Sequence, residues 1–295
     1  MHGLEKYNQN FHDLDGRLIQ PDLRIGFVLV PGFTILPFAG FMDTLRHAAD
    51  ESDHSQQVHC KWKILGPSME PIPSSCGVTI PPWEVYGDPT EFDYIVVVGG
   101  QTDLIGSVSK QTYEFLNKAE KHRISLVGLC VGVFVMAEAG ILTNQKCAIH
   151  PRHLNEFVER YPDLIPVIDE IFVIDLNLIT CAGGTAAIDL AVSILMNHLG
   201  ESQARKGLSH MLVDQHRENL HTPRHPYDEL DHCRDPRIKD AIHLMKKNLT
   251  FPFCVKDLAK QLGCSQRQLE RAFQKHAHVS PAKFWRQLRI KRARW

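Results

Sequence analysis

The sequence lacks the patterns that mark several protein classes. None of its eight cysteines, at positions 60, 76, 130, 147, 181, 233, 254 and 264, belongs to a C-x-x-C pair. No zinc site or redox pair is therefore indicated, and we expect neither a metal nor a cofactor. No apolar run reaches the roughly 18–20 residues that span a bilayer. The first twenty residues are polar and of mixed charge, unlike a signal peptide. We expect a cytoplasmic protein without membrane contact.

Acidic residues are scarce at the C-terminal end, which the net charge of −1 conceals. Residues 236–295 carry 15 Lys and Arg but only three acidic residues, a formal charge of +12, whereas the remainder carries −13. Segments of opposite charge indicate different partners. A basic tail that only keeps the chain in solution is the alternative.

The length of 295 residues and the hydrophobic content of 43% allow two compact domains. We predict a flexible arm (1–22), an α/β domain (23–215), a linker (216–235) and a helical domain (236–295). Continuous apolar runs alternate with helical patterns, which is typical of a doubly wound, mostly parallel sheet covered on both faces. The predicted strands are 23–30, 58–66, 92–100 and 124–130, with further strand material at 171–181. The predicted helices of this domain are 35–50, 110–121, 131–140 and 184–199, and residues 66–83 predict loops or a short hairpin.

Residues 128–132 read Gly-Leu-Cys-Val-Gly directly after a predicted strand. Small residues on both sides of a nucleophile-type residue permit the tight strand-to-helix turn of a nucleophile elbow. A helix that starts there would lower the pKa of the Cys130 thiol and offer N–H groups to an anion. The alternative is that Cys130 is a small buried hydrophobe.

Four segments, in this order, resemble the PfpI and class I glutamine-amidotransferase-like superfamily: LVPGFTILPFAGFMDTLR, YIVVVGG, LVGLCVGVFVMAEAGIL and CAIHP. The resemblance covers about residues 23–200 and implies a flavodoxin-like fold. It pairs Cys130 with His150, which Pro151 follows. Active members carry a Glu where this chain has Pro37, and many have a His where it has Val131. A Cys-His pair without an acid to orient the base is poorly equipped for catalysis, so we expect a non-catalytic binding pocket.

We expect this pocket to bind a ligand carboxylate through backbone N–H groups near two of the strand ends, with aromatic walls for a cationic group. An aromatic residue in a loop more often belongs to a core or a lid. The candidate ligand-binding residues are Phe33, Trp83, Gly99, Gly100, Cys130, Val131 and His150.

The basic segment predicts a helix from Pro236, a short helix over 255–262, a turn at Gly263 and a further helix that Ser265 caps. Two short helices joined by a tight turn indicate a helix-turn-helix, with an ordinary packed helix pair as the alternative. Long polar and cationic side chains on the second helix suit base edges and phosphates. The candidate DNA-binding residues are Ser265, Gln266, Arg267, Gln268, Glu270 and Arg271.

Residues 235–295 resemble the AraC/XylS DNA-binding family, on the pattern DPRI, RQLER, SP, F, LR and AR at the family's spacing. The resemblance implies that Ser265–His276 is the first recognition helix and that Pro281–Arg294 is the linking helix. His278 stands where the family has Gly, so we expect a strained turn. The family's second helix-turn-helix would come after Trp295. We therefore expect a truncated DNA-binding domain that binds DNA weakly and with strong salt dependence, rescued in part by dimerisation.

Together the two resemblances imply the architecture of the GlxA-type regulators, whose relatives control glycine betaine, carnitine and arginine catabolism. They imply a homodimeric transcription factor, usually an activator, that binds a promoter and senses a small amine, amino acid or quaternary-ammonium effector. One alternative is a Cys-dependent hydrolase, amidase or deglycase with an appended basic segment. Another is a chain that acts only by dimerising with full-length partners.

Overall fold

The structure is a computed structural model that describes residues 20–52, 54–217, 235–249 and 253–293. The chain divides into two compact units, residues 1–223 and residues 224–295, and each is described by itself. The predicted arm (1–22) and linker (216–235) lie almost entirely outside the described residues. The predicted domain boundaries therefore stay predictions.

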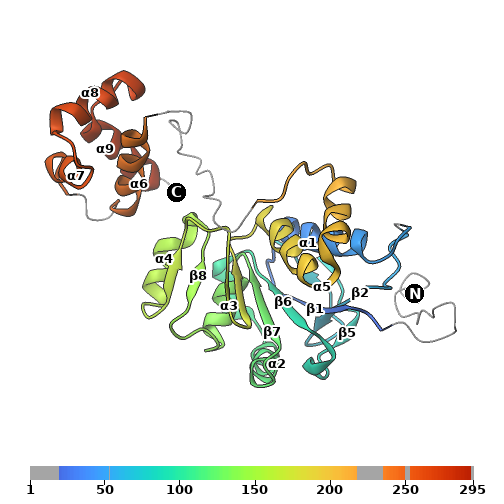
Figure 1. Cartoon of the computed structure of the whole chain (residues 1–295). Helices are drawn as coiled ribbons and strands as arrows, with labels where there is room; N and C mark the ends of the chain where they lie inside the picture. Colours follow the sequence, from blue (N-terminus) through green and yellow to red (C-terminus); the bar gives the residue numbers. More distant parts are fainter. Residues whose placement is uncertain (1–19, 53, 218–234, 250–252, 294–295) are drawn as a thin grey trace. The chain divides into compact units, whose positions relative to one another are not determined.

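A seven-stranded sheet forms the centre of the first unit (Figure 1). Every neighbouring pair is parallel except β10 and β11, which form an antiparallel pair at one edge. This confirms the predicted mostly parallel α/β sheet. In spatial order the strands are β10 (Phe172–Asp175), β11 (Leu178–Cys181), β7 (Ser125–Leu129), β6 (Tyr94–Val98), β1 (Leu23–Leu29), β2 (Cys60–Gly66) and β5 (Glu84–Val85).

Helices cover both faces of this sheet because its central strands are apolar throughout. On one face α1 (Ile35–Ala48) packs along α5 (Ala186–His210), over a core that contains Phe27 and Phe41. The other face carries α2 (Lys110–Lys121) and α3 (Gly132–Glu138), over a core that contains Val97 and Phe134. The chain kinks at Gly200, whose φ of +80° interrupts α5.

Short elements complete the unit. The predicted hairpin within 66–83 is confirmed as the antiparallel pair β3 (Ile72–Pro73) and β4 (Thr79–Ile80). A parallel pair, β8 (Lys146–Ala148) and β9 (Ile165–Val167), flanks α4 (Leu154–Arg160). Among the described residues of this unit, 3₁₀ helices are formed at η2 (Pro89–Glu91), η3 (Thr102–Ser107) and η4 (Pro151–His153).

The second unit is helical in its described residues: α6 (Pro236–Lys247), α7 (Val255–Gln261), α8 (Gln266–Ala277) and α9 (Pro281–Ala293). Ile238, Leu258, Leu269 and Phe273 have no exposed surface and form its core with Trp285. Among the described residues of both units, no helix is long and apolar enough to cross a membrane.

Candidate ligand site and nucleic-acid interface

Cys130 occupies a sharp turn between β7 and α3. Its φ is +56°, a left-handed conformation that is uncommon for a residue with a side chain, and its N–H donates to the carbonyl of Cys181 at 3.0 Å. Two residues later, a Cβ on Gly132 would overlap the carbonyl oxygen of Val97, so only glycine lets the helix start so close to β6. The predicted tight strand-to-helix turn at Cys130 is confirmed.

Two residues that the sequence analysis missed stand against this elbow. The hydroxyl of Thr34 lies close enough to the thiol of Cys130 to act on its pKa, and the Thr34 N–H donates to the carbonyl of Gly99 at 3.3 Å. Gly183 has a φ of +89°, and a Cβ on it would lie 2.7 Å from Cys130 Cβ and 3.2 Å from Cys130 Sγ. Thr34 is the N-cap of α1, so the Thr that precedes the first helical pattern was its sequence signal.

The elbow raises the pKa of the Cys130 thiol above its ordinary value. Burial is the main cause, because it disfavours the thiolate, and the N–H of Val131 and the hydroxyl of Thr34 offset it only in part. The expectation of a lowered pKa was therefore wrong. The helix that begins here is only seven residues long, and its polar end does not outweigh the desolvation. Cys130 is a neutral thiol near pH 7 and a weak nucleophile.

His150 makes its interactions locally. It is the N-cap of η4, where its Nδ1 accepts the N–H of Arg152 at 3.2 Å, and its ring lies 6.1 Å from that of His153. Desolvation, followed by the charges of His153 and Arg152, lowers its pKa. No hydrogen bond of the described residues joins His150 to Cys130. Pro37 is buried within the first turn of α1, so that position offers no carboxylate to orient a base.

The two predicted aromatic walls have different environments. The Phe33 ring has no exposed surface and packs edge-on against Phe38 at 5.9 Å, so it belongs to the core. Trp83 is half-buried at the rim of the same core, and its backbone N–H donates to the carbonyl of Ile64 at 2.7 Å.

Gly99 and Gly100 follow β6, and a Cβ on Gly100 would lie 2.7 Å from Thr34 Oγ1. The backbone at Gly100 therefore lies beside the elbow.

A helix-turn-helix is present in the second unit. It consists of α7, a turn at Gly263 with a φ of +64°, and α8, whose buried face carries Leu269, Ala272 and Phe273. At the far end of α8, His278 adopts a φ of +56°. A residue with a side chain is strained there, as predicted from the absence of the usual glycine.

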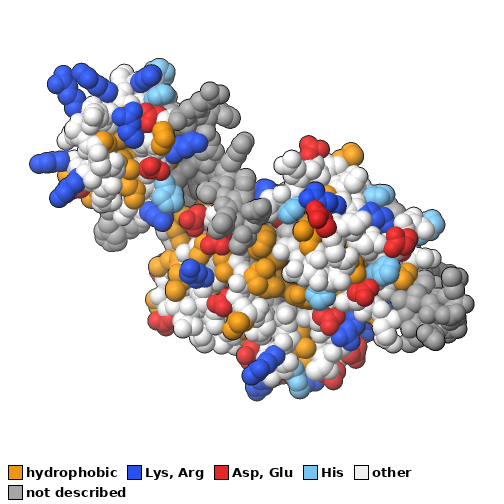
Figure 2. Space-filling model, viewed as in Figure 1, with side chains coloured by type: hydrophobic (Ala, Val, Ile, Leu, Met, Phe, Trp, Pro, Cys, Tyr) orange, Lys and Arg blue, Asp and Glu red, His pale blue; other side chains and the backbone are white. Residues whose placement is uncertain are grey.

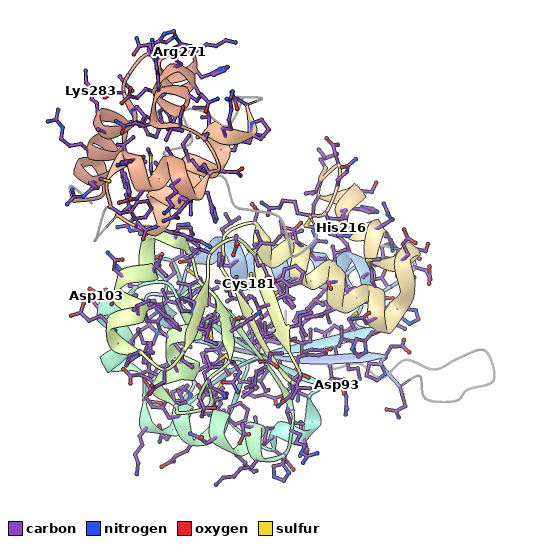
Figure 3. The ribbon with its side chains drawn as sticks, turned by 60° about the vertical axis from the view of Figure 1, so that its left-hand side comes forward. Asp93, Asp103, Cys181, His216, Arg271 and Lys283 are labelled. Atoms are coloured by element: carbon purple, nitrogen blue, oxygen red, sulfur yellow. The ribbon has the colours of Figure 1, made fainter. Side chains whose placement is uncertain are left out.

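The polar side chains of α8 are exposed. Some of them make hydrogen bonds with neighbouring residues, and others make none with the described residues. Gln266 donates to Glu270 at 2.9 Å, and Gln268 accepts the N–H of Ser265 at 2.8 Å. Arg267 and Arg271 are exposed and make no hydrogen bond or ion pair with the described residues. Arg271 extends from the outside of α8 in Figure 3, and Figure 2 shows Lys and Arg side chains across the visible face of this unit. Of the six predicted DNA-binding residues, the two arginines are therefore the cations without a partner among the described residues, and their contact with a nucleic acid stays a prediction.

Sequence comparison connects the chain with two kinds of protein. Residues 25–197 match the DJ-1/PfpI family. The HTH-type transcriptional regulator GbdR of Pseudomonas aeruginosa is 28% identical over 270 residues, which cover 92% of this chain and 72% of the regulator. The HTH-type transcriptional regulator GlxA of Rhizobium meliloti is 27% identical over 95% of this chain and 84% of its own length. Matches of this extent include both units.

Isonitrile hydratase of Pseudomonas putida is 30% identical, but the match covers only 62% of this chain and 75% of the hydratase. Among solved structures, DJ-1beta of Drosophila melanogaster aligns with a TM-score of 0.55 and 23% identity over 65% of this chain and 99% of its own. An AraC family transcriptional regulator from Pseudomonas putida aligns with a TM-score of 0.53 and 23% identity over 64% and 99%. At these identities the two structures show the fold alone.

Proposed function

Because the chain belongs to the DJ-1/PfpI family and its relatives across both units are HTH-type transcriptional regulators, we propose that it is a cytoplasmic AraC-type regulator. Its family domain senses a small metabolite, and its helical unit binds a promoter. The observation that carries this proposal is the extent of the match to the regulators, 92–95% of the chain, because it includes the helix-turn-helix as well as the elbow.

The chemistry of the elbow supports a sensor over an enzyme. A nucleophilic cysteine needs a lowered pKa, a base within hydrogen-bond reach and a group that orients the base. Cys130 has a raised pKa, the Nδ1 of His150 is occupied by the N–H of Arg152, and Pro37 offers no acid. The same surroundings offer hydrogen-bond donors to a ligand.

The proposed ligand is a small carboxylate that also carries an amine or a quaternary ammonium group. The Thr34 hydroxyl and the Val131 N–H, both beside the Cys130 thiol, are the donors for the carboxylate. Trp83 is the aromatic candidate for the cationic end. Gly99, Gly100 and His150 complete the site as the sequence predicts it.

Calorimetry with a panel of amino acids and quaternary-ammonium carboxylates tests the sensor. Thr34→Val keeps the shape of the side chain and removes the hydroxyl, so a ligand that binds there loses at least about tenfold in affinity, the value of one charge-assisted hydrogen bond. Thr90→Val, in η2, is the matched control. A panel member that binds both variants equally would remove Thr34 from the site.

Selection of genomic DNA fragments by the purified chain tests the regulator. We expect enrichment of a defined set of promoter fragments, and loss of that enrichment in Arg267→Ala/Arg271→Ala. Arg205→Ala, which removes an exposed arginine from α5 instead, should retain this enrichment.

We further propose that the chain acts as a homodimeric activator, since a dimer presents two helix-turn-helix units to paired half-sites. Sedimentation and a promoter-reporter assay check these two points.

A Cys-dependent hydrolase or deglycase of the same family is the second candidate. The 30% identity to isonitrile hydratase over 75% of the latter's length favours it. Incubation with isonitriles, amides and glyoxal adducts, with Cys130→Ala as the comparison, decides between them. Turnover that depends on Cys130 supports the enzyme, and equal rates in both proteins support the sensor.

A further inference from the structure

A buried ion pair holds the end of the described part of the first unit. The Asp189 carboxylate, only 5% exposed, accepts three hydrogen bonds from Arg217: from the backbone N–H at 2.5 Å, from Nε at 3.0 Å and from Nη2 at 2.6 Å. Nη2 also donates to Thr185 Oγ1 at 2.8 Å. A buried carboxylate needs such partners, because an unpaired charge away from water is costly.

Arg217 lies at the end of the described part of the first unit. Arg217 is the last described residue before 218–234, the range in which the boundary between the two units falls. The chain has run the length of α5, and residues 211–217 then return to the first turn of that helix, where Asp189 lies. His216, the neighbour of Arg217, is labelled in Figure 3 on this returning segment. Arg217 therefore ties the last described residue of the first unit to α5.

Thr185, which accepts a hydrogen bond from Arg217, lies close in the chain to Gly183, which stands against the Cys130 elbow. Thr185 follows Gly183 and Gly184, which connect β11 to α5 with φ values of +89° and +60°. Gly183 lies so close to Cys130 that even a Cβ would stand 2.7 Å from the Cys130 side chain. On the strand side, the Cys130 N–H is bonded to the carbonyl of Cys181. A group that presses on Cys130 or Gly183 therefore acts on the loop that carries Thr185 and leads into the first turn of α5.

There is also space for the arginine to move. A cleft of about 350 Å³ lies beside the ion pair, between β10 and α5, and both Asp189 and Arg217 line it. Its other walls include Phe172, Met196 and His216. The Arg217 side chain, already 32% exposed, can exchange its contact with Thr185 for water without creating a void in the core.

We propose that the contact of Arg217 with Asp189 and Thr185 is a latch that opens when the Cys130 elbow is occupied. This inference deepens the proposed function and rests on it, because a regulator has to transmit occupancy of its sensor to the start of the segment that leads to the DNA-binding unit. The latch is the bistable element, and the loop at Gly183–Thr185 is the path that couples it to the elbow.

The first test perturbs the elbow side and measures the latch. Gly183→Ala places a methyl group against Cys130, and amide hydrogen exchange of residues 211–217 reports the Arg217 N–H that Asp189 holds. We expect exchange of that amide to rise about tenfold, a typical coupling between sites. Gly140→Ala is the matched control, because Gly140 also has a positive φ, +73°, but open space at its Cβ. Equal protection in Gly183→Ala and Gly140→Ala would overturn the latch.

The second test perturbs the latch and measures the elbow. It uses milder substitutions, so it tests the proposal even if Gly183→Ala does not fold. Thr185→Val removes the acceptor of Nη2, and Arg217→Lys keeps the charge but loses the forked geometry. Both should speed alkylation of Cys130 by iodoacetamide about tenfold, measured by peptide mass spectrometry against the exposed Cys76 in the same chain. Arg205→Lys is the control. Unchanged Cys130 reactivity in both variants would overturn the proposal.

Neither test uses DNA or an effector. Loss of coupling in them contradicts the latch and leaves the regulator proposal intact. Failure of the genomic DNA selection contradicts the regulator, whatever the exchange and alkylation rates show.

Discussion

Ser265 and Gln268 cap each other at the start of α8. The Ser265 hydroxyl accepts the N–H of Gln268 at 3.3 Å, and the Gln268 side chain accepts the N–H of Ser265 at 2.8 Å. This reciprocal pair satisfies donors that the first turn of a helix leaves without partners. Both residues were predicted to contact DNA, yet their side chains already serve the helix. We therefore expect them to stabilise α8, and we expect the base or phosphate contacts to come from Arg267 and Arg271.

Ser265→Ala should destabilise the helix-turn-helix by about 1 kcal/mol, the typical value of an N-cap side chain. The effect should appear as faster amide hydrogen exchange across α8, with no change in α1. Gln274→Ala, an exposed change later on the same helix, controls for a general effect of alanine. Equal exchange in Ser265→Ala and the wild type would show that the cap contributes nothing to stability.

Arg271→Ala should weaken DNA binding. The pattern of the loss should show whether Arg271 contacts a phosphate or a base. Loss of a phosphate contact weakens binding uniformly across sequences and reduces the slope of log affinity against log salt by about 1. Loss of a base contact costs about 1–3 kcal/mol at one position of the site and leaves other positions unaffected. Titrations of the selected fragment at several salt concentrations, with Gln274→Ala as the control, distinguish the two. An unaltered affinity would exclude Arg271 from the interface.

The sequence predicted the fold well where the pattern was local. Helix 110–121 has the predicted bounds, and the strand that precedes the elbow is β7. Apolar runs between helical patterns are enough for a doubly wound sheet, because both faces of its strands must be covered. The Gly-Leu-Cys-Val-Gly motif likewise predicted the turn at Cys130, since only small residues permit that approach of helix and strand.

The environment of the site could not be predicted in the same way. The raised pKa of Cys130 results from burial, which a motif does not report. Asp189 and Arg217 are 28 residues apart and meet only because the chain returns along α5. Phe33 was expected in the pocket from its place after Gly32, but the side chain turns into the core. Contacts between distant segments depend on packing that no local pattern encodes.

Glycine at position 132 should be necessary for stability. A methyl group there would overlap the carbonyl oxygen of Val97, which belongs to the sheet and cannot move away as a flexible side chain can. Gly132→Ala should therefore lower the free energy of unfolding by about 1–3 kcal/mol, as overpacked cores do. Gly106→Ala, in η3, has open space at its Cβ and should change it by less than about 0.5 kcal/mol. Denaturant unfolding of both variants tests the contrast, and equal stabilities would contradict it.

Alkaline pH should destabilise the first unit through its buried thiols. Burial raises the pKa of Cys60 from 9.0 to about 12. Below about pH 9 the thiol is protonated in both the folded and the unfolded chain, so its contribution to stability is fully present there. Between about pH 9 and pH 12 only the unfolded chain loses the proton, and the free energy of unfolding falls by about 1.4 kcal/mol per pH unit for this group.

Comparison of Cys60→Ala with the wild type isolates this contribution from those of other alkaline groups. The variant should be less stable near pH 7, because it leaves a small cavity, and its stability should decline less steeply above about pH 9. The matched control is Cys76→Ala, since Cys76 is exposed and hydrogen bonding to Ser74 lowers its pKa instead. Urea unfolding at pH 7, 9 and 10 measures both slopes. Parallel declines in Cys60→Ala and the wild type would show that the Cys60 thiol does not titrate differently in the folded and unfolded chain.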